Sequence, residues 1–295
     1  MHAYLIMAHN DFYILEKLLK LIDDDRNDIY LHIDKKVKNF DFNYYKNIVK
    51  KSNIFFVKRL DVRWGTYSQI KCEMELLKAS AINNYKYYHL LSGVDLPLKN
   101  QNEIHNFFDK TDKEFIMFRD LNGLDNLRID RINYYHLFFK NARSNCKFKV
   151  KTSRKMHSTF LKLQKKLKYE RKKDISKYRD GANWFSITNS LVHYILENEK
   201  EINKKYKCTY CADEIFLQTL VYNSKFYKKV NSIKNDDYEG IKRAIDWKRG
   251  NPYTYKIEDF EYLINSDMFF ARKFSTKVDK KIIDKIYHYV KGGVK

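Results

Sequence analysis

Polar side chains follow two apolar segments near the start of the chain, where a ligand site can form. Residues 3–8 run into His9, and residues 29–33 run into Asp34. Between them, apolar residues recur at helical spacing from 14 to 22, so the pattern predicts a strand, a helix and a parallel strand. Ligands bind such sheets beyond the carboxyl ends of the strands. His9 and Asp34 are therefore candidate ligand contacts, although any surface strand can end in polar residues.

Two more predicted strands end in residues suited to ligand contact. The apolar segment 54–57 is followed by Trp64 and Gly65 at the entrance to a helical pattern, and the segment 87–91 is followed by a loop with Asp95. A tryptophan offers a flat face, and a glycine lets the backbone approach a ligand closely. Tryptophan is also a common core residue, so this pair alone is a weak signal. Together, the polar ends of these strands converge on one predicted edge.

Two charged pairs far along the chain carry groups that bond-forming chemistry needs. Asp213 and Glu214 open the apolar helical pattern of residues 215–221, and Arg272 and Lys273 lie between phenylalanines. Acids at a helix start can act as a general base, or they can merely complement the helix dipole, which is worth about 0.3–1 kcal/mol. We favour the dipole role for Asp213. The phenylalanines around Arg272 and Lys273 indicate a buried strand rather than a typical basic surface.

Length and composition indicate a single domain over residues 1–295. The chain is 44% hydrophobic and 16% aromatic, with eight Gly, two Pro and no linker-like stretch or internal repeat, so a sizeable core is available. No apolar run of about eighteen residues predicts a transmembrane helix, and the first residues lack a signal-peptide pattern. We expect an α/β fold with a basic insertion at about 138–180 and an amphipathic C-terminal helix at about 277–292.

The net charge of +21 indicates an anionic partner, and its location narrows the choice. Between residues 140 and 179 there are sixteen Lys and Arg against two acids, a net +14 within forty residues. Apolar residues interleave with these cations, as in a basic helix that lies on anionic lipid. A solvated insertion and a nucleic-acid surface remain alternatives, of which we favour nucleic acid least. The C-terminal helix can reinforce membrane docking or pack on the core.

Seven motifs in order resemble the core-2/I-branching family, glycosyltransferase family 14, which includes β-1,6-N-acetylglucosaminyltransferases and peptide O-xylosyltransferases. The similarity extends from Tyr4 to Phe274, nearly the whole chain. Each motif is modestly specific, but seven in sequence are hard to obtain by chance. The resemblance implies a GT-A type fold with a central, mostly parallel mixed sheet flanked by helices, a UDP-sugar donor and inversion at the anomeric carbon. The motifs are residues 8–9, 32–36, 63–68, 90–98, 183–186, 213–219 and 270–274.

The resemblance also implies roles for individual residues. Glu214 aligns with the family's catalytic glutamate, which implies that it takes the proton from the acceptor hydroxyl, and Arg272 and Lys273 match the pair that binds the diphosphate. Trp184 and Phe185 match a segment on the acceptor side, although core packing is nearly as good an account of Trp184. The remaining matched positions are on the donor side: Ala8, His9 and Asp34 near the uridine, Trp64 and Gly65 in a donor-contacting loop, and Asp95 near the donor sugar, with Arg243 a weaker candidate.

The sequence favours transfer without a metal or any other cofactor. Many GT-A enzymes hold a divalent cation with Asp-x-Asp after the central strand, a Lewis-acid role. Here that strand leads to Gly-Val-Asp95, and the only Asp-x-Asp is 23–25, at a predicted helix end. Fixed cations such as Arg272 and Lys273 can stabilise a departing diphosphate instead. The pair Cys208 and Cys211 has no second CxxC or His pair to complete a metal site.

Compared with animal relatives, the sequence lacks a signal anchor, a stem and a cysteine-rich framework, so a secretory setting and a glycoprotein acceptor are in doubt. We therefore expect a bacterial cytoplasmic enzyme, peripheral at the inner face of the cell membrane, that adds N-acetylglucosamine to a surface polysaccharide or lipid-linked glycan. UDP-xylose, UDP-glucose and UDP-glucuronate are alternative donors. A non-catalytic protein that binds nucleic acid or another polyanion is the alternative from a different class.

Overall fold

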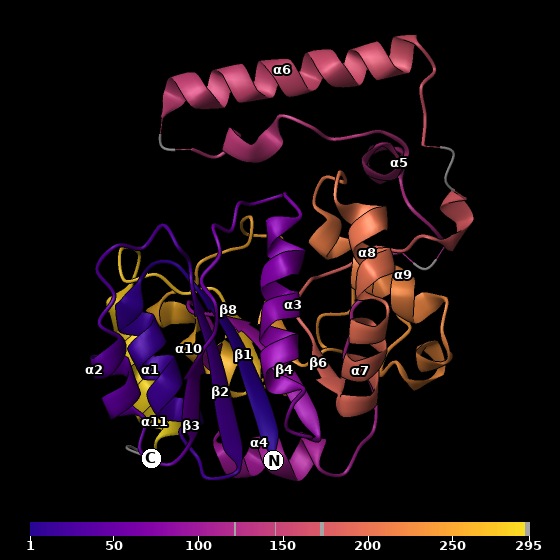
Figure 1. Cartoon of the computed structure of the whole chain (residues 1–295). Helices are drawn as coiled ribbons and strands as arrows, with labels where there is room; N and C mark the ends of the chain where they lie inside the picture. Colours follow the sequence, from indigo (N-terminus) through magenta and orange to yellow (C-terminus); the bar gives the residue numbers. More distant parts are fainter. Residues whose placement is uncertain (121, 145, 172–173, 293–295) are drawn as a thin grey trace.

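The computed structural model describes residues 1–120, 122–144, 146–171 and 174–292, and it contains a five-stranded main sheet (Figure 1). The strand order is β3-β2-β1-β4-β6. Four strands run parallel and β6 pairs antiparallel with β4, so the carboxyl ends of the parallel strands share the upper edge in Figure 1. The bounds are β1 (His2–Ala8), β2 (Asn27–Ile33), β3 (Asn53–Phe56), β4 (Tyr87–Ser92) and β6 (Ser186–Thr188).

Both faces of the main sheet are buried, because successive side chains of a strand point to opposite faces. Tyr4 and Ile6 of β1 lie in one hydrophobic cluster, and Ala3 and Leu5 lie in the other. The first cluster includes residues of α1 (Phe12–Ile22), α2 (Phe42–Ile48), α4 (Gln101–Phe108), α10 (Phe260–Ile264) and α11 (Lys280–Val290). The second includes residues of α3 (Ser68–Ser80), α7 (Asn189–Glu197), α8 (Glu199–Tyr206) and α9 (Phe216–Tyr222).

A second, smaller sheet joins the end of the chain to the end of β4. Its order is β5-β8-β7, with β5 (Leu96–Pro97), β7 (Arg243–Ile245) and β8 (Phe270–Arg272). The backbone N–H of Leu98 donates to the carbonyl of Phe269 at 2.8 Å, and that of Phe274 donates to Val94 at 3.1 Å. These pairings carry Arg272 to the carboxyl edge of the main sheet, 177 residues away from Asp95 in sequence.

The basic insertion forms a separate layer beyond that edge. Residues 138–180 contain a 3₁₀ turn η1 (Phe139–Asn141), the long helix α6 (Lys147–Lys166) and η2 (Ile175–Lys177), and α5 (Asn126–Asn133) comes just before them. In Figure 1, α6 lies across the top of the molecule. Its underside rests on the segment before it: the Gln164 amide bonds both the N–H and the C=O of Tyr135 at 2.9 Å, and the Ser153 hydroxyl donates to the carbonyl of Phe138.

The predicted α/β architecture with a mostly parallel central sheet is confirmed. For the C-terminal helix, the structure favours core packing: Ile282, Ile283 and Ile286 of α11 are fully buried. No helix in the described ranges combines the length and hydrophobicity that crossing a bilayer requires. Three further 3₁₀ turns complete the elements: η3 (Ala212–Glu214), η4 (Lys225–Lys229) and η5 (Ile257–Asp259).

Candidate active site

Asp34, at the end of β2, is a buried carboxylate whose hydrogen bonds come from its own neighbourhood. It accepts from the backbone N–H and the Nζ of Lys36, both at 2.7 Å, and from the backbone N–H of Val62 at 3.2 Å. The same Lys36 Nζ also reaches Asp61 at 3.0 Å. Asp34 therefore holds together the two loops that follow β2 and β3, and through them it shapes this part of the edge.

His9 and Ala8 end β1 beside Asp34. Ala8 is buried, and its carbonyl accepts from the Asp34 N–H at 2.9 Å, so its side chain offers no surface to a ligand. A Cβ on Gly93 would lie 2.7 Å from the Ala8 Cβ, which shows how closely the ends of β1 and β4 pack. The His9 ring is at the surface, but the surrounding protein partly desolvates it and lowers its pKa. The charges of Lys36 and Arg272 lower this pKa further, and the charge of Asp34 opposes the shift.

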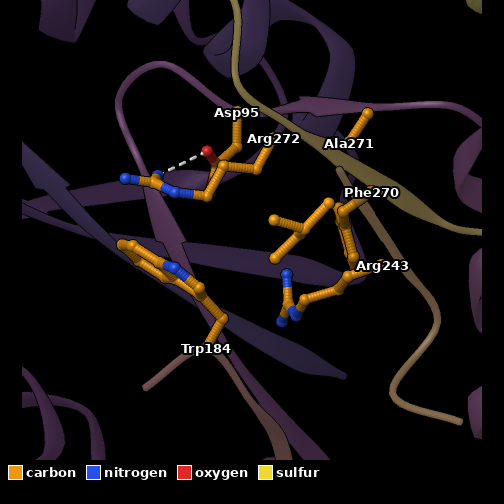
Figure 2. Close-up of a pocket in the computed structure, with 7 residues that line it drawn as sticks. Asp95, Trp184, Arg243, Phe270, Ala271 and Arg272 are labelled. Carbon is orange, nitrogen blue, oxygen red and sulfur yellow. Dashed lines mark hydrogen bonds and ion pairs between the residues drawn. The ribbon is translucent and has the colours of Figure 1, made fainter. Parts of the chain in front are cut away.

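Arg272 is clamped between a buried carboxylate and an indole ring (Figure 2). Its Nη1 donates to Asp95 Oδ1 at 2.7 Å, and its guanidinium carbon lies 4.1 Å from the centre of the Trp184 ring. Asp95 Oδ2 accepts from the backbone N–H of Ser92 at 2.8 Å. Burial raises the pKa of Asp95, and the charge of Arg272 opposes that shift. The clamp fixes one cation at the carboxyl edge, with Trp184 beside it.

Arg243 forms the floor of the narrow recess that Asp95, Trp184 and Arg272 line (Figure 2). It is buried, and its Nη2 donates to the carbonyl of Phe185 at 2.6 Å. Burial lowers the pKa of Arg243 to about 10, and the charge of Asp95 opposes that shift. The Phe185 ring, which we expected on the acceptor side, is only 1% exposed and packs in the core, and its carbonyl supports Arg243.

Lys273 lies within the electrostatic influence of Arg143, a residue that the sequence analysis did not single out. Burial lowers the pKa of Lys273, and the charges of Arg272 and Arg143 lower it further. Arg143 comes from the basic insertion, and its guanidinium carbon lies 3.2 Å from the centre of the Trp64 ring. It was missed because it is one of sixteen Lys and Arg in its segment and no motif marks it. The insertion thus contributes a third cation to the site.

Replacing Arg143 with Ala is expected to raise the donor KM about five- to tenfold with a smaller change in kcat. The reason is that the substitution removes one of the cations that we expect to face the diphosphate, an interaction of about 1 kcal/mol, and every 1.4 kcal/mol is tenfold in affinity. Steady-state kinetics with varied donor checks this result. Lys151→Ala, on the exposed part of α6, is the matched control and should leave the donor KM unchanged. An unchanged donor KM in Arg143→Ala would remove Arg143 from the site.

Gly65 is explained by a tyrosine rather than by a ligand. It has φ of 73°, and a Cβ there would lie 2.6 Å from the ring of Tyr210. Its carbonyl accepts from the backbone N–H of Cys211 at 3.0 Å. The expectation of a close ligand approach at this glycine is therefore replaced by a packing reason. The contact ties the Trp64 loop to the loop that carries Glu214, and Trp64 itself stays 40% exposed beside Arg143.

Glu214 lies in η3, before α9 begins, and its carboxylate faces a basic side chain. Arg131 Nη1 donates to Glu214 Oε2 at 2.9 Å, and the Glu214 side chain remains 31% exposed. The backbone carbonyl of Glu214 accepts from the Gly181 N–H at 2.9 Å. Three residues further along, Trp184 packs on Arg272. One short segment therefore connects the candidate base to the cation clamp, and Arg131, from α5, is a second site residue that the sequence analysis missed.

Asp213, for which we expected a helix-dipole role, is a buried acid. Gln69 Nε2 donates to its Oδ2 at 2.6 Å, while Oδ1 has no hydrogen-bond partner among the described residues. Burial, and then the charge of Glu214, raise the pKa of Asp213 to about 7. Burial likewise raises the pKa of Glu73, with the charge of Asp213 contributing. The carboxyl group of Asp213 is thus linked to the Trp64 loop through Gln69, whose side-chain oxygen accepts from the Gly65 N–H.

Asp213→Asn is expected to be more favourable to stability at pH 8 than at pH 5. The difference in free energy of unfolding between variant and wild type should be about 1–3 kcal/mol larger at pH 8. The unfolded chain releases this proton near pH 4, whereas the folded protein keeps it to about pH 7. Stability contributed by the group is therefore lost as the pH rises through that range, and an amide removes the loss. Urea unfolding at both pH values measures the effect. The exposed Asp267→Asn is the control; equal pH dependence in wild type and Asp213→Asn would refute the assignment.

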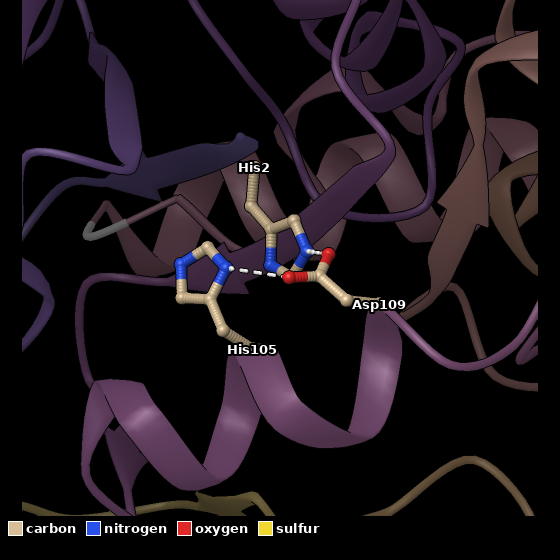
Figure 3. Close-up of side chains that lie close together, drawn as sticks. All are labelled: His2, His105 and Asp109. Atoms are coloured by element: carbon tan, nitrogen blue, oxygen red, sulfur yellow. Dashed lines mark hydrogen bonds and ion pairs between the residues drawn. The ribbon is translucent and has the colours of Figure 1, made fainter.

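The described residues contain one cluster with metal-ligand chemistry, His2, His105 and Asp109 (Figure 3). His2 Nε2 lies 3.2 Å from Asp109 Oδ1, and His105 Nδ1 lies 3.6 Å from Asp109 Oδ2. The two rings are stacked, with centroids 4.0 Å apart and planes at 21°. Each ring binds a metal through an in-plane lone pair, so stacked rings cannot both aim at one ion. The cluster also lies at the start of β1, the edge opposite the candidate site.

Comparison with known proteins agrees with the motifs. The sequence profile of the Core-2/I-Branching enzyme family matches residues 2–266. A human beta-1,3-galactosyl-O-glycosyl-glycoprotein beta-1,6-N-acetylglucosaminyltransferase is 23% identical over 305 residues, which cover 94% of this chain and 66% of that protein. Rat xylosyltransferase 2 is 23% identical over 309 residues, 96% of this chain and 33% of that protein.

Among solved structures, apo mouse xyloside xylosyltransferase 1 aligns with a TM-score of 0.36 at 10% identity, over 92% of this chain and 97% of that one. The chain spans 66% of the length of the human N-acetylglucosaminyltransferase and 33% of the length of rat xylosyltransferase 2. Because the family profile covers most of the sequence, the resemblance drawn from the motifs is confirmed. The chain belongs to the Core-2/I-branching enzyme family.

Proposed function

We propose that the protein is an inverting glycosyltransferase that moves a sugar from a UDP-sugar to a hydroxyl group of a glycan. The observation that carries this proposal is the placement of Glu214 and of the Arg272–Asp95 clamp at the two ends of the segment from Gly181 to Trp184. Transfer from a nucleoside diphosphate needs a base for the acceptor and positive charge for the leaving group. Glu214 can supply the base and the clamp can supply the charge, and the segment from Gly181 to Trp184 links them.

In the proposed reaction, Glu214 takes the proton of the acceptor hydroxyl as its oxygen attacks the anomeric carbon. The new C–O bond forms on the face opposite the leaving group, the bond to the diphosphate oxygen breaks, and UDP departs with that electron pair. Arg272 and Lys273 stabilise the negative charge that develops on the diphosphate. Arg131 holds the Glu214 carboxylate in place at 2.9 Å.

We also propose that transfer needs no divalent metal. In support, the carboxylate that follows β4, Asp95, is already bonded to Arg272 and to the Ser92 N–H, so its oxygens serve the cation clamp. The charges of Arg272 and Arg143 both act on Lys273, and we take these three cations as the groups that balance the diphosphate. N-acetylglucosamine is the favoured sugar, because one of the two curated relatives is named for it; xylose, glucose and glucuronate remain alternatives. The proposed setting is surface polysaccharide or lipid-linked glycan synthesis at the cytoplasmic face of a membrane.

A thermal-shift screen tests this function directly, because a ligand that binds the native state raises its melting temperature. UDP and UDP-sugars are expected to raise Tm by several degrees at a hundredfold excess over Kd, a gain of about 2.7 kcal/mol, whereas GDP, CMP and ADP are not. The shift should persist in EDTA. A shift with every nucleotide would point to a polyanion-binding protein, and a shift abolished by EDTA would overturn metal independence.

A further inference from the structure

The long helix α6 carries a row of apolar side chains that no other part of the described chain covers. Phe148, Met156, Leu163 and Leu167 are 77%, 46%, 50% and 66% exposed, although each is large enough to belong in a core. Their spacing of eight, seven and four residues places them within an arc of about 100° on the helix. Ser153 and Gln164, the buried residues of α6, lie on the side of the helix next to this arc and outside it. The exposed row, which we call the α6 stripe, is therefore not the face that holds the helix in place.

Cations flank the stripe and no acid interrupts it. Residues 147–166 contain eight Lys and Arg and no Asp or Glu. Within the described residues, Lys165 is the one of these eight with an acidic partner, Asp130. The others include Lys155, Lys162 and Lys166, which are exposed on the same outer half of the helix. An apolar row edged by unpaired cations is the surface of a helix that lies in the headgroup region of an anionic bilayer.

This arrangement separates a lipid surface from the other partners of a basic segment. A merely solvated insertion gains nothing by exposing four large apolar side chains in a row. A nucleic acid pairs with the cations, but its backbone offers no apolar layer for Met156, Leu163 and Leu167. A bilayer surface accounts for both features, because the acyl chains can bury the apolar stripe and the anionic headgroups can pair with the lysines.

We propose that the α6 stripe docks on an anionic lipid bilayer and holds the candidate active site toward that surface. The helix lies beyond the carboxyl edge of the main sheet, the edge that carries the site (Figure 1). Just before α6, Arg143 stacks on Trp64, so the docking layer and the site are joined by direct contact. This inference rests on the proposed function, and it adds that the acceptor is a glycan anchored in the bilayer on which α6 lies.

Co-sedimentation of the full chain with sucrose-loaded vesicles tests the surface. Vesicles of phosphatidylglycerol and phosphatidylcholine in equal parts should bind the protein, and vesicles of phosphatidylcholine alone should not. Leu163→Gln/Leu167→Gln and Lys155→Glu/Lys162→Glu should each weaken binding at least about tenfold. The controls are Ile82→Gln/Ile233→Gln, which removes two apolar residues that are 82% and 62% exposed, and Lys204→Glu/Lys234→Glu, which makes the same charge change elsewhere. Unchanged binding in the α6 variants, or equal loss in the controls, would overturn the proposal.

A second measurement separates this inference from the proposed function. Donor binding by thermal shift is expected to be the same in the α6 variants and the wild type, because neither pair touches the site. Transfer to a glycan displayed on anionic vesicles should fall in the α6 variants, while transfer to the same glycan free in solution should not. If no variant transfers sugar but vesicle binding still depends on α6, the function fails and the docking surface stands. If duplex DNA binds at physiological salt and the vesicles do not, the docking proposal is wrong.

Discussion

Replacing Glu214 with Gln is expected to lower kcat by about 10²–10⁴-fold while donor binding and folding change little. The amide cannot accept the proton of the acceptor hydroxyl, but it keeps an oxygen for the Arg131 hydrogen bond, which measures 2.9 Å. Because the Glu214 side chain is 31% exposed, losing its charge should alter the free energy of unfolding by less than about 1 kcal/mol. Single-turnover transfer rates, with UDP titration on the same sample, measure the two effects separately.

Asp213→Asn is the matched control for this experiment. It removes a carboxylate from the neighbouring residue and keeps the Gln69 contact of 2.6 Å, but Asp213 is buried whereas Glu214 is partly exposed. Its kcat is therefore expected to stay within about fivefold of wild type. Should Glu214→Gln keep more than a tenth of wild-type kcat, or should Asp213→Asn lose as much as Glu214→Gln, the assignment of the base would be wrong.

The part of the site that the sequence predicts is the part that local patterns determine. Strand periodicity and the polar residues after each strand place His9, Asp34 and Asp95 at one edge, because parallel strands joined by helices end on the same side. The structure has these three at the ends of β1, β2 and β4. What their side chains bond to is not local: Asp95 pairs with Arg272, and that pairing depends on how the small sheet folds back.

The residues that the sequence missed make long-range contacts. Arg143 lies in a segment so rich in cations that charge alone does not rank it, and Arg131 lies in α5, 83 residues before its partner Glu214, where no motif marks it. The burial of Asp213 was also missed. An acid beside an apolar helix pattern is interpreted as a helix-dipole partner from sequence, and only the tertiary packing shows that it is buried. Gly65 was singled out for close approach to a ligand, whereas the structure gives a packing reason for a glycine there, the Tyr210 ring, which only the tertiary structure supplies.

Arg272→Ala is expected to have two effects that a second substitution can separate. Removing the guanidinium leaves the Asp95 carboxylate, whose side chain is 3% exposed, without its partner at 2.7 Å. Breaking a buried ion pair in this way costs about 3–5 kcal/mol, and the 21% exposure of Arg272 places our expectation at the lower end. The same change removes a fixed cation from the diphosphate, for which we expect kcat/KM to fall about 10²–10³-fold.

The stability effect of Arg272→Ala should depend on pH in a defined direction. Burial raises the pKa of Asp95 even with Arg272 present, and losing that cation removes an influence that lowers it. The folded variant therefore holds the Asp95 proton to higher pH than the unfolded chain does, so stability is lost as the pH rises above the unfolded value near 4. Denaturant unfolding at pH 5 and pH 8 should show the larger destabilisation at pH 8.

The double variant Asp95→Asn/Arg272→Ala decides whether Arg272 acts on the diphosphate or only on the fold. The amide needs no counter-charge, so most of the lost stability should return, and the coupling energy from the double-mutant cycle should be about 1–3 kcal/mol. Activity should not return, because Lys273 and Arg143 alone leave the departing diphosphate short of one cation. Recovery of both stability and kcat/KM would show that Arg272 merely neutralises Asp95. Recovery of stability alone makes Arg272 a residue that touches the reacting group.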